Sequence, residues 1–335
     1  LRSYFCRFGL CSAKKIELST AIPILLLYSP QSIVMSRRQF LQTSTFAIGA
    51  SMLPTAWLSQ LLAPAGEMKT LRNNVGIFTE RGGTIAWMID KEGLVVVDTQ
   101  FPDTAVHLIE AIRKQNDRRV DLLINTHHHG DHSGGNIAFK GIVDKVVAHK
   151  NSKANQERTA IAAKSEDKQL YPDTTFDGTW SQKVGSETLS LHYFGPGHTN
   201  GDSFVHFENA NVVHCGDLMF NRRFPNIDRA AGASIANWIV ALGKARKTFS
   251  KDTLYIFGHG AEGFPVTGTE KDLIAMQNYL SKLLKFIKKE IKAGKTKEQI
   301  LAAKYQVIPG AEEWKGQGIE RSLTTAFDEL MEGKK

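Results

Sequence analysis

The 335-residue sequence predicts an α/β protein built on two β-sheets. Short apolar runs rich in valine and isoleucine occur in two batches, residues 75–98 and 187–215, and glycines and charged residues mark the turns between them. Helical segments follow each batch, a pattern typical of an α/β protein with two sheets. After about residue 266 the sequence becomes helical.

The first half of the predicted domain alternates strands and helices. Strands are expected at residues 75–79, 84–90, 94–98, 120–125 and 145–149. A helix follows Pro102, and its apolar residues Val106, Ile109 and Ile112 are expected on one side. A polar helix follows the strand at 145–149 and runs to about Lys168.

The second half repeats this alternation. Strands are expected at 187–194, 203–207, 211–215 and 253–257, with a helix over roughly 233–248. The loops at 150–183 and 218–232, together with the C-terminal helices, are expected to shape a pocket. Trp180, Phe220 and Phe224 either line this pocket or pack within the fold.

A helical extension is predicted over residues 266–335. Thr269 and Asp272 have the spacing of a capping box, and Thr296 with Gln299 starts a further helix after Gly294. Apolar residues recur at spacings of three and four: Leu273, Met276, Leu280, Leu283, Ile287 and Ile291. We expect this stripe to pack against the body of the protein or a dimer partner; covering the substrate is the alternative.

Residues 35–65 have the features of an export signal. Two arginines, Arg37 and Arg38, precede a moderately apolar stretch, and Ala63-Pro64-Ala65 provides a small-residue cleavage site. The order Ser-Arg-Arg-x-Phe-Leu resembles a bacterial twin-arginine signal. The alternative is a membrane anchor or a buried helix, but the stretch is too polar for a comfortable membrane span.

This interpretation assigns the remaining parts of the chain. Residues 1–34 are expected to be a non-native upstream extension, with Met35 as the native initiator. The mature protein would be periplasmic, without stable membrane insertion once the signal is removed. Cys215 is the one cysteine after Met35, so an internal disulfide is not expected to stabilise the mature chain.

The net charge argues against a nucleic-acid partner. Residues 1–65 hold six basic residues and one acidic residue, or +5 of the total charge of +8. The other 270 residues therefore carry 36 basic and 33 acidic residues, or +3. A body so close to neutrality lacks the basic surface that binds DNA or RNA.

The motif THHHGDHSGG, which follows the strand at 120–125, predicts a metal site. On an extended segment, residues two apart point the same way, so His127 and His129 face one point and His128 faces elsewhere. Gly130 allows a tight turn that brings Asp131 and His132 to the same pocket. Imidazole nitrogens and carboxylate oxygens are ligands that zinc accepts readily.

Three further candidate ligands follow other predicted strands. His198 lies in GPGHTNGD after the strand at 187–194. Asp217 comes after the strand at 211–215, and His259 comes after the strand at 253–257. Loops at strand ends carry ligands on a rigid scaffold, and the total of seven ligands is enough for two adjacent metals.

These residues resemble the metallo-β-lactamase superfamily over about residues 75–265. The motifs that carry the resemblance are HHHGDH, GPGHT, GDL, GHG and LVVVDT, the last of which contains Asp98, a structural aspartate in that family. The resemblance implies an αββα four-layer sandwich over residues 66–265, with the metals at one edge of the two sheets. It also implies two zinc ions, with iron or manganese as alternatives.

The resemblance further implies how the ligands divide. One metal would be held by His127, His129 and His198, the second by Asp131, His132 and His259, and Asp217 would bridge them. A hydroxide between two such cations is a nucleophile at neutral pH. Asp131 would orient it and carry its proton to the leaving group, which predicts hydrolysis of an amide, ester, lactone or thioester.

Departures from true β-lactamases leave the substrate open, although a β-lactam is one candidate. Some of those enzymes have a metal-binding cysteine where Asp217 stands here, and Cys215 is expected to pack in the core. An aspartate at this position is typical of thioesterases, lactonases and nucleases. The lysine that binds the lactam carboxylate is absent, and Arg222 and Arg223 either serve an anionic substrate or face solvent.

Other functions on the same scaffold remain as alternatives. An iron-dependent, sulfur dioxygenase-like oxidoreductase would use His127, His198 and Asp217 only. Diiron members carry glutamate where His129 stands, which argues against them. A nuclease is disfavoured by the near-neutral body, and a metal-binding module without catalysis is disfavoured because all seven ligands are present. The oligomeric state is open.

Overall fold

The computed structural model describes residues 66–303 and 305–332. They belong to one compact unit, Ala63–Lys335. The predicted upstream extension and export signal fall in residues 1–65, outside the described residues. Within the described ranges, no helix combines the length and the apolar character that crossing a membrane requires.

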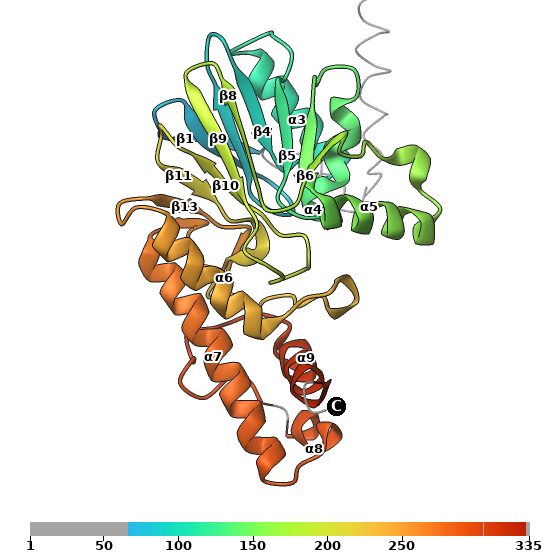
Figure 1. Ribbon diagram of the computed structural model, residues 1–335, viewed down its shortest axis with the longest axis vertical. Helices are drawn as coiled ribbons and strands as arrows, with labels where there is room; N and C mark the ends of the chain where they lie inside the picture. Colours follow the sequence, from blue (N-terminus) through green and yellow to red (C-terminus); the bar gives the residue numbers. More distant parts are fainter. Residues whose placement is uncertain (1–65, 304, 333–335) are drawn as a thin grey trace, which may run out of the picture. The chain divides into compact units, whose positions relative to one another are not determined.

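The first sheet has seven strands. In spatial order they are β1 (Glu67–Arg72), β2 (Val75–Thr79), β3 (Ile85–Ile89), β4 (Leu94–Val97), β5 (Leu122–Asn125), β6 (Val146–His149) and β7 (Thr174–Phe176). Three of them, β4, β5 and β6, lie side by side in Figure 1. Strands β1 to β4 pair antiparallel, whereas β4 to β7 pair parallel. The loops that follow β4, β5 and β6 therefore emerge at one edge, the usual place for ligand sites in such sheets.

The second sheet has six strands. In spatial order they are β15 (Thr267–Gly268), β13 (Leu254–Ile256), β11 (Val212–His214), β10 (Phe204–Phe207), β9 (Glu187–His192) and β8 (Thr179–Val184). Strands β11 and β13 are parallel neighbours, so the segments after them also share an edge. Just beyond, β12 (Phe220–Asn221) pairs in parallel with β14 (His259–Gly260).

Seven α-helices lie within the described ranges. They are α3 (Pro102–Arg113), α4 (Gly130–Ser133), α5 (Lys150–Ala163), α6 (Ile235–Thr248), α7 (Glu270–Lys292), α8 (Lys297–Ala302) and α9 (Ile319–Glu332). Short 3-10 turns occupy Gly134–Phe139, Glu166–Lys168, Gly216–Leu218 and Arg229–Ala231.

The two sheets pack face to face between outer layers of helices. Val95 of the first sheet and Leu189 of the second belong to the core between the sheets. On the outer face of the first sheet, α3 buries Leu108, and on the outer face of the second, α6 and α7 bury Trp238 and Leu273. Each fully buried apolar side chain of this kind contributes roughly 1.5–3 kcal/mol. The fold is therefore the predicted αββα sandwich.

Two local predictions were wrong. Val106 is 44% exposed, because the stripe of α3 that faces the sheet is Ala105, Leu108 and Ile112, and Val106 lies about 100° around the helix from Ala105. The segment 150–183 is not a loop, since it forms α5, β7 and β8, but Gln156 of α5 borders a cavity beside His129, so the segment does help to shape a pocket. Strand β8 was not predicted because it lies at an edge of its sheet and five of its six side chains are exposed or partly exposed.

The C-terminal helices pack on the body, as predicted. Helix α7 begins with the expected capping box of Thr269 and Asp272, and α8 begins with that of Thr296 and Gln299. Helix α7 lies against α6 and α9. Tyr279 of α7 stacks on the indole of Trp314, with ring centroids 4.2 Å apart.

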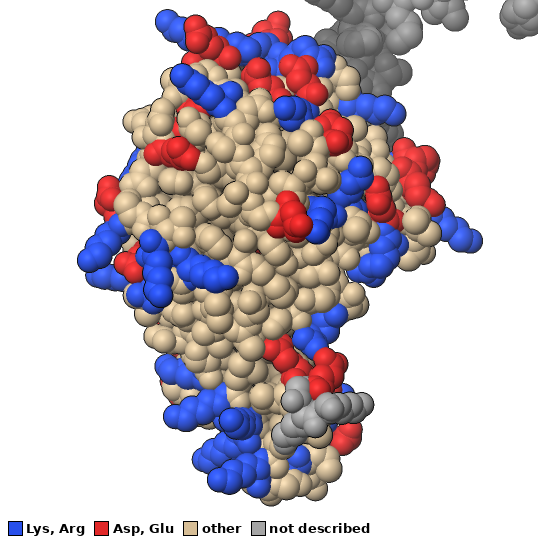
Figure 2. All heavy atoms as spheres, viewed as in Figure 1, with Lys and Arg blue, Asp and Glu red and all other residues tan. Residues whose placement is uncertain are grey.

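Charged side chains are unevenly placed on the face shown in Figure 2. Lysines and arginines gather over the lower end of α7, whereas both signs mix over the sheets. The exposed lysines of α7 include Lys285, Lys288, Lys289 and Lys292. The strongest local basic charge on this face therefore belongs to the helical region.

Candidate metal centre

The histidine motif directly follows β5. Residue His129 has extended backbone angles (φ −64°, ψ 148°), and the single turn of α4 begins after it. The rings of His127 and His129 lie 4.9 Å apart, and the ring of His198 lies 4.8 Å and 4.6 Å from them, respectively. The extended backbone thus brings His127 and His129 to one point, as the sequence predicted, and the loop after β9 adds His198.

The first donor group consists of His127, His129, His198 and Asp217, each offering one ligand atom, all within 4.8 Å of one another. The His198 Nε2 atom is 2.8 Å from His129 Nδ1. The Asp217 Oδ2 atom lies 3.5 Å from His198 Nε2 and 3.9 Å from His127 Nε2. Three strand ends therefore supply one compact set of nitrogen and oxygen donors.

The second donor group consists of Asp131, His132 and His259. Asp131 Oδ2 lies 3.2 Å from His259 Nε2, and the Nε2 atoms of His132 and His259 are 3.5 Å apart. The other oxygen of Asp217, Oδ1, lies 3.0 Å from His132 Nε2 and 3.3 Å from His259 Nε2. Asp217 thus directs one carboxylate oxygen to each donor group.

Buried atoms without partners show that these residues fit a metal. The His127 Nε2 and Asp217 Oδ1 atoms are buried and make no hydrogen bond in the described part of the chain. Such groups are costly to bury unless a ligand satisfies them. Burial also holds the pKa of His127 well below its usual range and lowers the pKa of His198 to about 4. Both imidazoles are therefore neutral near pH 7, the form that coordinates a metal.

Asp98 orients His132, a member of the second donor group. Its Oδ2 atom lies 2.7 Å from His132 Nδ1, and its two oxygens also accept hydrogen bonds from the backbone N–H and hydroxyl of Thr126. Burial lowers the pKa of His132, but the carboxylates of Asp217 and Asp98 outweigh it and raise that pKa well above the usual value. The structural role predicted for Asp98 is therefore to fix the His132 ring with Nε2 toward Asp217.

Two glycines permit the close packing of the site. A Cβ atom at Gly258 would overlap Asp217 Oδ1, and a Cβ atom at Gly83 would overlap the ring of His132. The backbone after β13 thus packs directly against Asp217, and the backbone before β3 packs directly against His132. Side chains at either position would push the donors apart.

The sequence reasoning missed Asp228, which holds His129 in place. Asp228 Oδ2 lies 2.9 Å from His129 Nε2, so His129 turns its Nδ1 atom toward His198. The hydrogen bond from His129 lowers the pKa of Asp228, so this carboxyl stays ionised. No motif surrounds Asp228 in the sequence, and its partner lies 99 residues away. His128 faces the same carboxylate at 3.8 Å, outside the two donor groups.

Glu329 of α9 anchors the segment that carries Asp228. Its carboxylate accepts hydrogen bonds from the backbone N–H groups of Ile235 and Ala236 at the start of α6, at 2.8 Å and 2.9 Å. It also forms an ion pair with Arg229, at 3.4 Å. The backbone N–H of Asp228 in turn donates to the carbonyl of His198, at 3.1 Å. The C-terminal helix is thereby connected to the first donor group.

Replacing Asp228 with asparagine is expected to weaken metal binding about 10- to 100-fold, the usual effect of losing a carboxylate that orients a ligating histidine. The neutral amide of asparagine attracts a proton on His129 Nε2 less strongly than the carboxylate does. The His129 Nδ1 atom is then less often in the unprotonated form that coordinates a metal. Competition with a chromogenic chelator measures the effect. Asp117→Asn, at an exposed carboxylate, is the control. Equal affinities in both variants would contradict this role for Asp228.

The remaining residues singled out from the sequence lie outside the two donor groups. Cys215 is buried in the core around Trp238, as predicted, and burial raises the pKa of its thiol well above the usual value. Phe220 stacks on the ring of His259 and Phe224 packs near Tyr279. Five other histidines occupy the predicted helix or strands: His107, His149, His192, His206 and His214.

Comparison with known proteins places this site in a family. Residues 79–259 match the family model described as the metallo-beta-lactamase superfamily. The chain is 23% identical over 205 residues to a metallo-beta-lactamase type 2 of Elizabethkingia meningoseptica, covering 58% of this chain and 79% of that protein. It is 27% identical over 175 residues to a metallo-beta-lactamase type 2 of Bacillus cereus, covering 51% of this chain and 64% of that protein.

Solved structures show the same fold. A metallo-beta-lactamase from Pontibacter korlensis superposes with a TM-score of 0.53 at 22% identity, covering 64% of this chain and 99% of that one. A double mutant of the sec-alkyl sulfatase PisA1 gives a TM-score of 0.64 at 13% identity, covering 83% of this chain and 52% of that one. Together with the family match over residues 79–259, these findings identify the chain as a member of the metallo-β-lactamase superfamily and a metal-dependent hydrolase.

Proposed function

We propose that this protein is a dinuclear zinc hydrolase that cleaves an amide, ester, lactone or thioester bond in a small molecule. The position of Asp217 supports this most directly, because its two oxygens face two different donor groups, 3.5 Å from His198 Nε2 and 3.0 Å from His132 Nε2. A carboxylate so placed suits a bridge between two ions. The set of imidazole nitrogens and carboxylate oxygens suits zinc.

The proposed division of labour follows the two donor groups. His127, His129 and His198 would hold one ion, Asp131, His132 and His259 the other, and Asp217 both. When bound, two divalent cations polarise the bond to be cleaved and lower the pKa of water. The second donor group is as compact as the first, which favours the dinuclear hydrolase over a mononuclear iron oxidoreductase that would leave it idle.

Asp131 is the proposed proton carrier. Its side chain is 30% exposed, whereas that of Asp217 is only 4% exposed, so Asp131 is the carboxylate that reaches the solvent-facing side. Burial raises the pKa of Asp131, but the hydrogen bond from His259 and the nearby His132 outweigh it, and its pKa falls below the usual value. The carboxylate is therefore ionised near neutral pH and ready to accept a proton from the attacking water.

The cavities beside the donor groups favour a small substrate. One, of about 160 Å³, is bordered by Thr84, Gly258 and His259. Another, of about 250 Å³, is bordered by His129 and by Gln156 of α5. Both volumes are below the range of roughly 300–1,000 Å³ that is typical of small-molecule pockets. β-Lactams are candidates on the strength of the relatives' names, beside lactones and thioesters.

We also propose that residues 35–65 are a twin-arginine signal, that residues 1–34 are an upstream extension, and that residues 66–335 form the periplasmic mature protein. Within it, residues 66–265 would be the hydrolase domain and residues 266–335 the helical extension. The Arg37-Arg38 pair and the Ala63-Pro64-Ala65 site support this. N-terminal sequencing of the exported protein is expected to begin at Gly66. Export of a variant that carries both Arg37→Lys and Arg38→Lys would argue against the twin-arginine signal.

Elemental analysis of residues 66–335, purified without added metal, tests the proposed function. We expect about two zinc ions per chain and hydrolysis of at least one member of a panel of lactams, lactones and thioesters. Manganese in place of zinc at the same stoichiometry would keep the dinuclear hydrolase and change the metal. One iron per chain, with oxygen uptake on sulfur substrates, would overturn it.

A further inference from the structure

Two adjacent arginines beside the donor groups have different environments. Arg222 is partly buried, and its guanidinium is held by Asp272 at 3.1 Å and by Glu313 at 3.2 Å. Its left-handed backbone (φ 56°) turns the chain, and the next residue, Arg223, is exposed. Within the described residues the guanidinium of Arg223 has neither an ion pair nor a hydrogen bond. Arg222 therefore has a structural role in binding Asp272 and Glu313, whereas the side chain of Arg223 is available to a ligand.

A second unpaired cation lies next to Arg223. The backbone N–H of Lys315 donates to the carbonyl of Arg222, at 2.8 Å, and the N–H of Phe224 donates to the carbonyl of Lys315, at 3.1 Å. This parallel pairing holds Lys315 alongside Arg223. The ammonium of Lys315 lies 5.4 Å from the ring centroid of Phe264 and, among the described residues, has no carboxylate partner. The backbone pairing thus places two cationic residues side by side, and among the described residues neither side chain has a carboxylate partner.

The cations border a cavity that continues toward the metal centre. A cavity of about 330 Å³ is bordered by Arg223, Gly260, Glu262 and Lys315. Arg223 and Gly260 also border the smaller cavity of about 160 Å³ that reaches His259. Arg223 therefore stands between the cavity lined by Lys315 and a proposed metal ligand. A substrate extending from the donor groups along this side would meet both cations.

We propose that Arg223 and Lys315 bind a carboxylate of the substrate while the bond to be cleaved lies at the donor groups. This inference rests on the proposed function and narrows its substrates to anionic ones. Among the described residues, Glu262 is the one carboxylate that lines the larger cavity, so the side chains there carry a net charge of +1. This charge matches a singly charged carboxylate better than a doubly charged phosphate. Arginine binds carboxylates and phosphates alike in a bidentate manner, so the charge of the cavity decides between them.

Half of this subsite comes from outside the family match. Lys315 lies beyond residues 79–259, in the segment between α8 and α9. Its position depends on backbone pairing with the loop that follows β12. The helical extension therefore contributes a substrate contact as well as packing.

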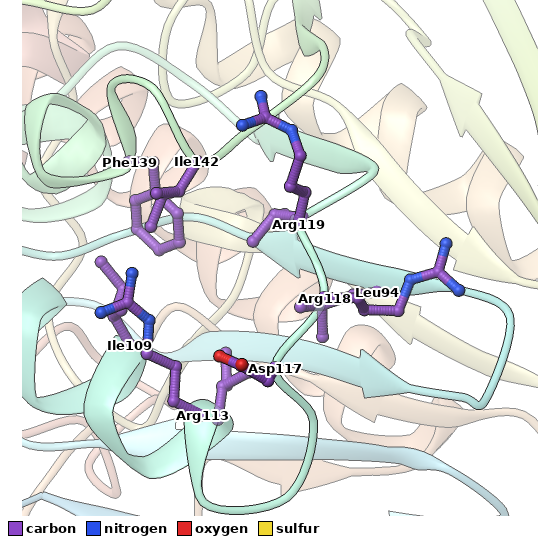
Figure 3. Close-up of a pocket in the computed structure, with 10 residues that line it drawn as sticks. Leu94, Ile109, Arg113, Asp117, Arg118, Arg119, Phe139 and Ile142 are labelled. Carbon is purple, nitrogen blue, oxygen red and sulfur yellow. The ribbon is translucent and has the colours of Figure 1, made fainter.

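The chain offers a matched control for Arg223. Arg113, at the end of α3, is also exposed and unpaired among the described residues, and it borders a cavity of about 80 Å³ (Figure 3). That cavity lies near the amino end of β5, whereas the histidine motif follows its carboxyl end. The other two arginines that line this cavity form ion pairs, Arg118 with Asp121 and Arg119 with Asp144. Arg113→Ala thus removes an equivalent charge away from the site.

Two esters with the same leaving group test the proposal in the zinc-loaded protein. The anionic probe is mono-4-nitrophenyl glutarate and the neutral probe is 4-nitrophenyl acetate. We expect the wild type to prefer the anionic ester in kcat/KM. Arg223→Ala and Lys315→Ala should each lower the anionic-to-neutral ratio about 10- to 100-fold, the usual effect of losing a charge-assisted hydrogen bond. Arg113→Ala should leave the ratio at its wild-type value.

Each outcome decides the inference separately from the proposed function. Hydrolysis with no anionic preference, or with a ratio unchanged in both variants, overturns the carboxylate subsite and leaves the hydrolase standing. If neither ester is cleaved, calorimetric titration of the metal-free protein with glutarate decides the subsite. Binding that is lost in Arg223→Ala and Lys315→Ala supports it, and no binding by the wild type overturns it. Thermal denaturation confirms that each variant is folded.

Discussion

Replacing Asp217 with asparagine is expected to reduce bound metal from about two ions per chain to about one and to slow hydrolysis on the order of 10³-fold. A catalytic metal contributes several kcal/mol to the transition state, and each 1.36 kcal/mol is a factor of ten in rate. Asparagine has nearly the same shape but only one oxygen, so it cannot serve both His198 and His132. Elemental analysis and initial rates measure the two effects.

Glu187→Gln is the control for removing a buried carboxylate. Glu187 is 2% exposed and accepts hydrogen bonds from the backbone N–H groups of Thr188, Asn209 and Ala210, away from the donor groups. Its substitution is expected to cost stability without changing metal content. If Asp217→Asn retained two ions per chain, Asp217 would not join two metal sites.

Replacing Asp98 with asparagine is expected to destabilise the metal-free protein by about 3 kcal/mol, typical for breaking a buried charged pair. Asp98 is fully buried, and its carboxylate accepts hydrogen bonds from two donors on Thr126 and from His132. An amide can accept at only one atom, so at least one of these donors loses its partner. Urea denaturation measures the change in the free energy of unfolding.

An exposed aspartate provides the comparison. Asp144 is paired with Arg119 at 2.6 Å, but both side chains are more than half exposed, at 53% and 55%. Asp144→Asn should therefore change stability by less than about 1 kcal/mol. The Asp98 variant should in addition bind metal about 10- to 100-fold more weakly, because the His132 ring loses its orienting partner. Equal stability of the two variants would contradict the role given to Asp98.

The sequence predicted those parts of the fold and site that depend on local pattern. The spacing of His127 and His129 on an extended segment gave their shared direction, and the two are 4.9 Å apart. The capping boxes at Thr269 and Thr296 marked where helices begin. Such features follow from residues a few positions apart. The sandwich itself was inferred from family motifs rather than from periodicity.

Contacts between distant segments could not be predicted. Asp228 meets His129 across 99 residues, and Lys315 reaches Arg223 only because the segment between α8 and α9 pairs with the loop after β12. Val106 has the spacing of a buried residue, but the sheet accepts a different stripe of α3. In each case the partner surface decides, and the sequence alone does not show where that surface lies.

The contact of Glu329 with the start of α6 has a consequence for biosynthesis. All seven candidate ligands precede residue 260, yet the segment that holds Asp228 against His129 is fastened by a residue translated well after them. A ribosome-bound chain from which every candidate ligand has emerged still lacks the hydrogen bonds between Glu329 and the start of α6. Metal loading is therefore expected to be completed after translation of Glu329, and a translocase that accepts only folded cargo would suit that order of events.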